Sequence, residues 1–71
     1  MAELSPPVRE LIRTAEALAD EMAHPFVGSE HLLLAIVEAD DDLAAHRILA
    51  ETGGLQGVRR YLEEMFGRPV G

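Results

Sequence analysis

Apolar residues recur every three or four positions along four stretches of the chain. The first stretch follows Ser5 and opens with Pro6 and Pro7. Ser5 is a candidate N-cap, and prolines are tolerated in a first helical turn because their missing amide hydrogens are not needed there. The spacing predicts an amphipathic helix that ends near His24, since the residue before a proline resists helical geometry. Its expected apolar face consists of Val8, Leu11, Ile12, Ala15, Leu18, Ala19 and Met22.

A continuous apolar run from Leu32 to Val37 makes the second stretch, and a short apolar bridge at residues 26–28 leads into it. Ser29 is a candidate N-cap, and Glu30 places a negative charge where it suits the dipole of a helix. Six consecutive apolar residues also suit a buried strand. The cap and the high helix propensity of Leu and Ala favour a short helix that is buried on most sides.

Charged and glycine residues separate the last two stretches. Asp40–Asp42 is expected to end the second helix and to cap a third one, which Gly53–Gly54 stops. The fourth helix should end at Gly67, two residues before Pro69, while Gly57 inside it has no evident role. The expected apolar positions are Leu43, Ala44, Ile48 and Leu49 in the third helix and Leu55, Val58, Tyr61, Leu62, Met65 and Phe66 in the fourth.

These patterns predict an all-α fold, a small bundle of four short helices, with no alternating stretch that indicates a strand. With 71 residues, the chain has room for one domain, residues 1–71, and for one hydrophobic core. A domain of this size buries only roughly 60% of the surface that its unfolded chain exposes. It contains no cysteine, so disulfides cannot reinforce it. Self-association is therefore expected.

Charge and hydropathy narrow the classes of partner. Thirteen acidic and six basic residues give a formal net charge of −7, and residues 1–42 hold ten of the acids with only two arginines. Neutralising phosphates requires a basic surface, so we exclude nucleic acid as a partner. No apolar run approaches the roughly 20 residues of a membrane span, and the first residues lack the features of a signal peptide. We expect a cytoplasmic protein with no membrane partner. The abundance of Arg and Ala without Lys or Asn suits a GC-rich bacterial source.

The sequence contains few side chains in arrangements that suit catalysis or metal binding. His24, His31 and His46 lack the spacing of a metal site, and we expect His31 to pack at a helix start with its ring bonded to a backbone carbonyl. Asp40–Asp42 lacks the ligand order and turn glycine of a calcium loop. The four hydroxyl residues Ser5, Thr14, Ser29 and Thr52 offer no nucleophile beside a base. We therefore predict no catalytic residue, no metal and no cofactor, and we expect a protein that is not an enzyme.

The segment around Ser29 and Glu30 suggests a binding site instead. A helix N-terminus offers free amide donors to an anion, and a neighbouring carboxylate can bind a guanidinium through two hydrogen bonds. The pair suits a ligand that carries both groups, and Ser5 would supply a further hydroxyl. The alternative is purely structural, with Ser29 as a cap and Glu30 as a partner of the helix dipole.

The segment His24–Ile36, HPFVGSEHLLLAI, resembles the signature G-H-x-x-[VI]-G-T-E-H-[LI]-L-L-[GA]-[LI] of the amino-terminal repeat of Clp unfoldases. Ser5 lies where that family has a Thr at the opening of its first helix. Ala44–Gly53 is similar to the family element A-A-x-x-[IV]-L-x-x-[LA]-G, and Leu55–Gly67 resembles its closing helix. The likeness covers nearly the whole chain.

The resemblance implies a four-helix repeat, two of which form a pseudo-twofold domain that receives adaptors and substrates. In the branch that handles proteins tagged with phosphoarginine, each repeat binds the tag through residues that correspond here to Glu30, Ser29 and Ser5. Three departures concern loop geometry. Ala23 stands where the family has glycine, Ser replaces Thr at both hydroxyl positions, and the turn after Gly53 is one residue shorter.

Only one repeat is present, and no ATPase motif follows it. We therefore expect a homodimer that completes the double repeat, with two equivalent sites. The leading hypothesis is a protein-binding module of protein quality control, whose partner is a tagged substrate, an adaptor or a Clp unfoldase. The second hypothesis is a structural homo-association domain with no ligand site. A small hydrolase or metalloprotein remains a third, remote one.

Overall fold

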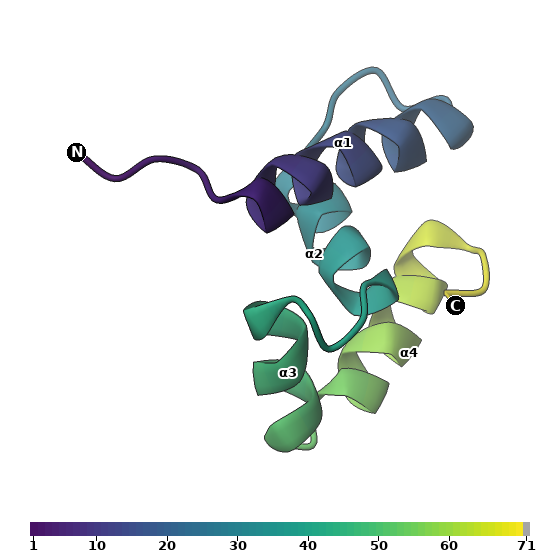
Figure 1. Ribbon diagram of the computed structural model, residues 1–71. Helices are drawn as coiled ribbons and strands as arrows, with labels where there is room; N and C mark the ends of the chain where they lie inside the picture. The colour runs from purple at the N-terminus through teal and green to yellow at the C-terminus, as the bar shows by residue number, and fades with distance from the viewer. Residues whose placement is uncertain (71) are drawn as a thin grey trace. The chain divides into compact units, whose positions relative to one another are not determined.

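The computed structural model describes residues 1–70 and contains four helices and no strand in that range (Figure 1). They are α1, Pro6–Glu21; α2, Ser29–Glu38; α3, Ala44–Glu51; and α4, Leu55–Phe66. The predicted all-α fold of four short helices is thus confirmed. The chain divides into two compact units, one from Met1 to Ala35 and one from Ile36 onward, with the boundary inside α2. None of the helices in residues 1–70 is both long and apolar enough to cross a membrane.

The first unit begins with α1, which the sequence predicts closely. Ser5 is its N-cap and accepts a hydrogen bond from the amide of Val8 at 3.4 Å, with Pro6 and Pro7 in the first turn. The buried positions Ala15, Leu18 and Ala19 belong to the predicted apolar face, and the polar residues of the opposite face are exposed: Arg9, Arg13, Glu16 and Asp20.

The end of α1 lies at Glu21, earlier than the predicted boundary at His24. Ala23 has φ +57°, a left-handed conformation, and it ends the helix two residues before Pro25. The amide of Ala23 donates to the carbonyl of Asp20, and the amide of His24 donates to the carbonyl of Ala19. This pair of bonds is a Schellman motif, which satisfies carbonyls that the helix leaves open.

The apolar bridge after α1 is not buried. Phe26 is 80% exposed and Val27 is 47% exposed. The next helix, α2, is buried on most sides along its apolar run at residues 32–37, as predicted. Leu34, Ala35 and Val37 are buried, and the other three residues of the run are partly buried.

In the second unit, α3 and α4 run side by side as a helical hairpin (Figure 1). The prediction that Asp40–Asp42 caps α3 is wrong. Asp40 instead accepts a hydrogen bond from the amide of Asp42 at 3.1 Å, and Leu43 occupies the N-cap position with no side-chain cap. An aspartate that bonds two residues ahead forms a turn of its own, so the triple Asp ends α2 and does not start α3.

The predicted apolar face of α3 is also partly wrong. Ile48 is 61% exposed, whereas His46 is 7% exposed and its Nδ1 lies 2.9 Å from the carbonyl oxygen of Ile36. A prediction from helical periodicity considers only apolar residues, so it missed His46. A histidine can be buried when its ring forms a hydrogen bond to the backbone, as here.

The helix stops of the second unit agree with the predictions. Gly53 has φ +79° directly after Thr52, the C-cap of α3, and Gly67 has φ +68° directly after α4. Beyond Gly67 the chain turns back, and the amide of the buried Val70 donates to Glu63 Oε2 at 3.1 Å. On α4 itself Leu62 is buried, while Tyr61 and Met65 are 68% and 50% exposed, against the expectation that both belong to an apolar contact face.

Candidate functional site

The start of α2 is held by Gly28 and not by Ser29. The carbonyl of Gly28 accepts from the amides of His31 at 3.1 Å and Leu32 at 3.4 Å, which makes Gly28 the N-cap and Ser29 the first helical residue. The predicted cap is therefore displaced by one residue. Because the hydroxyl of Ser29 makes no hydrogen bond to any other described residue, it is not needed to cap the helix.

The side chain of His31 completes this cap. Its ring is buried, with 3% of the residue exposed, and its Nδ1 accepts a hydrogen bond from the amide of Gly28 at 2.9 Å. In a capping box the third helical residue binds back to the N-cap amide in this way, usually with a Glu or Gln side chain. The expected bond from His31 to a backbone carbonyl is thus wrong, because this ring accepts from an amide.

A second imidazole extends the chain of hydrogen bonds. Nε2 of His31 lies 2.8 Å from Nδ1 of His24, and the two rings meet edge to face at 5.0 Å between centroids. Since the amide nitrogen of Gly28 can only donate, Nδ1 of His31 accepts and carries no proton, so the proton of this ring lies on Nε2 and is donated to His24. We call the group of His24, Gly28 and His31 the histidine cap. It joins the end of α1 to the start of α2.

Glu30 lies beside the histidine cap with 49% of its side chain exposed. Its carboxylate folds back against Gly28, where any Cβ would overlap Oε1 of Glu30. Oε1 is also 3.9 Å from Nδ1 of His31, which is already an acceptor for Gly28. Glycine at position 28 therefore leaves the room that this carboxylate occupies.

Two of the three predicted site residues come together. Ser29 and Glu30 are consecutive, exposed and located in the first turn of α2, where amides have no intrahelical partner. Ser5 is exposed at the start of α1, and its hydroxyl accepts the cap bond from the amide of Val8. Within residues 1–70, no hydrogen bond joins Ser5 to Ser29 or Glu30.

The first turn of α2 can bind two kinds of charge. Its free amides and the helix dipole favour an anion, while the Glu30 carboxylate can accept two hydrogen bonds from a guanidinium. In the part that the structure describes, no three residues of the types His, Cys, Asp or Glu cluster as metal ligands would.

The histidine cap is not predicted by the sequence pattern, in which each histidine stands alone. The usable signal is the position of His31, the third residue of a helix, with an N-cap glycine before it. The pairing with His24 depends on a turn that the spacing of seven residues does not reveal.

Residues 3–70 match the family model described as the Clp repeat (R) N-terminal domain. The chain belongs to this Clp repeat family. It is thus a protein-interaction module of the Clp type. No solved structure matches the chain significantly.

The left-handed backbone at Ala23 explains why glycine suits this position in the Clp repeat signature. Where the signature has glycine, this chain has Ala23, and the structure shows that the position is left-handed, at φ +57°. Glycine adopts that conformation freely, whereas alanine is strained in it. The departure therefore changes the energy of the turn and leaves its hydrogen bonds in place.

Proposed function

We propose that this Clp repeat is a non-enzymatic module that binds a phosphoarginine-like group on a protein through the first turn of α2. Glu30 binds the guanidinium, while Ser29 and the free amides of the turn bind the phosphate. Ser5 contributes a further hydroxyl when the ligand is bound. The module acts in bacterial cytoplasmic protein quality control, with a tagged substrate, an adaptor or an unfoldase as its partner.

One observation carries this proposal. Gly28 and His31 supply the cap of α2, so the exposed Ser29 hydroxyl and Glu30 carboxylate are not consumed by folding. The structural alternative required Ser29 to be the cap. Exposed polar groups beside a helix N-terminus that are not used internally suit a charged ligand.

The phosphoarginine proposal is tested by titration with free phosphoarginine, with arginine and phosphate as separate controls, while amide chemical shifts are recorded. We expect saturable shifts at Ser29 and Glu30, and no saturation with either half of the ligand alone, because each half makes only part of the contacts. The variant Glu16→Gln removes one exposed carboxylate elsewhere in the same unit and serves as the control. Silence of the wild type toward all three ligands would contradict the proposal and favour the structural homo-association domain.

We also propose that two copies of the chain pair through a twofold axis and so present two equivalent sites. A repeat of this size has a small core, and large apolar side chains remain exposed in the part of the chain that the structure describes. Sedimentation equilibrium at micromolar concentration tests this part independently of any ligand. A monomer throughout that range would contradict it.

A further inference from the structure

The exposed face of α4 carries a row of residues one turn apart. Tyr61 and Met65 are 68% and 50% exposed, and a shallow hollow of about 230 Å³ lies between Tyr61, Glu64 and Met65. Adjacent large apolar side chains on a helix surface usually mark an interface. A hollow between them offers a place for a side chain of the partner.

Gly57 extends this row by one turn toward the start of α4. A Cβ at Gly57 would have nothing within 4 Å, so no contact inside the chain requires glycine there. Its φ does not require glycine either, because among residues 1–70 the positive φ values belong to Ala23, Gly53 and Gly67. Glycine inside a helix is less favourable than alanine, because it loses more conformational freedom on folding. An approaching side chain would use the open surface above it.

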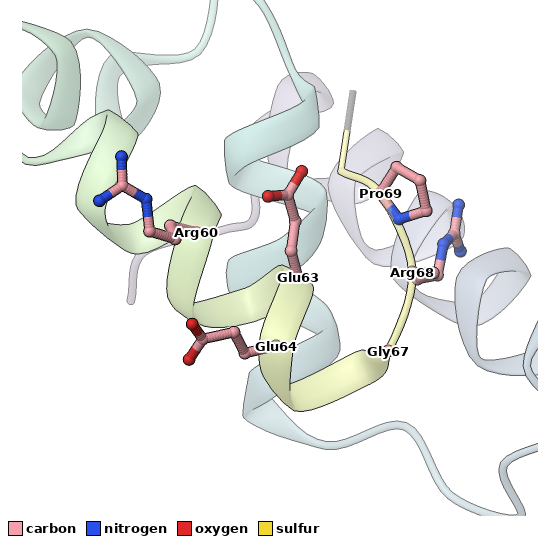
Figure 2. A pocket seen from close by; sticks show the side chains of 6 residues that line it. All are labelled: Arg60, Glu63, Glu64, Gly67, Arg68 and Pro69. Atoms are coloured by element: carbon pink, nitrogen blue, oxygen red, sulfur yellow. The ribbon is translucent and has the colours of Figure 1, made fainter.

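Two opposite charges, Arg60 and Glu64, lie beside this row, so the same surface of a second copy can pair with them. Figure 2 shows Arg60 and Glu64 projecting from the same side of α4, one turn apart, at the edge of an open hollow of about 520 Å³. When two copies of such a helix pair antiparallel about a twofold axis close to Tyr61, the long side chain of Arg60 in each lies within reach of Glu64 of the other. Residues 59–68 contain three arginines and two glutamates, so two copies repel less here than their net charge of −7 each suggests.

We infer that a second copy of this chain packs on this face through an antiparallel pair of α4 helices centred at Tyr61. Met65 of each copy lies over Gly57 of the other, and Arg60 pairs with Glu64 of the other on both sides of the axis. The row at four-residue intervals forms the ridge with which helices of globular proteins most often interlock. This inference rests on the dimer of the proposed function and specifies its surface.

A pair of charge reversals tests the inference between molecules. Arg60→Glu places a glutamate at both position 60 and position 64 of each α4, and Glu64→Arg places an arginine at both positions, so each variant alone should repel its own copies. We expect the dissociation constant of each to rise by about tenfold or more. Mixed in equal amounts, the two variants should form a heterodimer with nearly wild-type affinity in sedimentation equilibrium, because all its charge pairs are opposite.

Two further variants check the apolar row. Gly57→Met should weaken the dimer by about tenfold while leaving the melting of the diluted monomer unimpaired, because its side chain meets open space in one copy and Met65 in a pair. Arg47→Glu changes an exposed charge on α3 and is the control that should dimerise normally.

Each remaining outcome overturns the inference. A wild type that stays monomeric would refute both the dimer and its surface, whatever the ligand titration shows. A dimer that ignores the α4 variants and dissociates with Phe26→Ala would place the interface on the exposed loop after α1. In that case the proposed dimer would stand and the inferred surface would be wrong.

Discussion

The ends of α1 and α3 have the same hydrogen bonds and different residues. At both ends the left-handed residue donates to the third carbonyl before it, and the next amide donates to the fifth carbonyl before it. The left-handed residue is Gly53 after α3, at φ +79°, and Ala23 after α1, at φ +57°. The same backbone motif therefore forms with Gly53, which adopts a left-handed conformation freely, and with Ala23, whose Cβ opposes that conformation.

What differs is the support that each turn receives. The turn after α3 leads through Gly54 into α4, and Gly53 has open space around it. The turn after α1 leads into the histidine cap, in which His24 and His31 bond each other and Gly28 bonds His31. A strained residue persists where its surroundings fix the backbone. The connection before the candidate site is therefore held by side-chain hydrogen bonds, whereas the connection after α3 relies on glycine.

The largest expected effect comes from removing the support of the first turn. His31→Ala deletes a buried ring and leaves the amide of Gly28 without its acceptor, so the free energy of unfolding should fall by about 2–4 kcal/mol. His31→Gln keeps an acceptor at the usual capping-box position and should lose about half as much. Urea unfolding followed by circular dichroism measures both.

His46→Ala is the matched control for this prediction. It also removes a buried histidine with one backbone contact, but in the other unit. Both alanine variants should be destabilised, and only His31→Ala should alter the amide shifts of Ser29 and Glu30. Equal changes at Ser29 and Glu30 in both variants would show that the histidine cap does not position the site.

Exchanging the two left-handed residues should give effects of intermediate size and opposite sign. Gly53→Ala should destabilise by about 1–2 kcal/mol, because an L-residue is strained there although space is available. Ala23→Gly should stabilise by about 0.5–1 kcal/mol, since the relief of strain exceeds the entropy that glycine adds to the unfolded chain. Thermal and urea unfolding of the two variants check the pair, and loss of stability in Ala23→Gly would contradict the account of that turn.

The smallest expected effect separates the two serines at the helix starts. Ser5→Ala removes a cap bond of 3.4 Å and should cost about 0.5–1 kcal/mol. Ser29→Ala removes no internal hydrogen bond and should stay within about 0.5 kcal/mol of the wild type. If Ser29→Ala proved the more destabilising of the two, Ser29 would be a cap after all.

The helices themselves were predictable because their signals are local. Ser5 with two prolines, the apolar run at 32–37 and the glycines at 53 and 67 each fix a helix boundary or a buried face without help from distant residues. The end of α1 was placed too late for the converse reason. Alanine normally continues a helix, so nothing in the residue itself indicates the left-handed turn at Ala23.

The candidate site was predictable in its exposed residues and not in its support. Ser29 and Glu30 follow from the chemistry of a helix start, whereas the role of His31 as the cap depends on a ring that reaches back to Gly28. The burial of His46 and the exposure of Ile48 likewise depend on tertiary packing, which reverses the order that hydrophobicity alone predicts. No feature of the chain explains Gly57 except the surface inferred for a second copy.

The proposed binding of phosphoarginine requires that Glu30 serves the ligand and not the helix. The most direct test measures phosphoarginine affinity and urea stability on the same preparations of wild type, Glu30→Gln and the control Glu16→Gln. We predict that Glu30→Gln abolishes binding and changes the free energy of unfolding by less than about 1 kcal/mol, while Glu16→Gln leaves binding intact. Glu30→Gln with unchanged affinity, or with a loss of stability large enough to account for weaker binding, would contradict the claim.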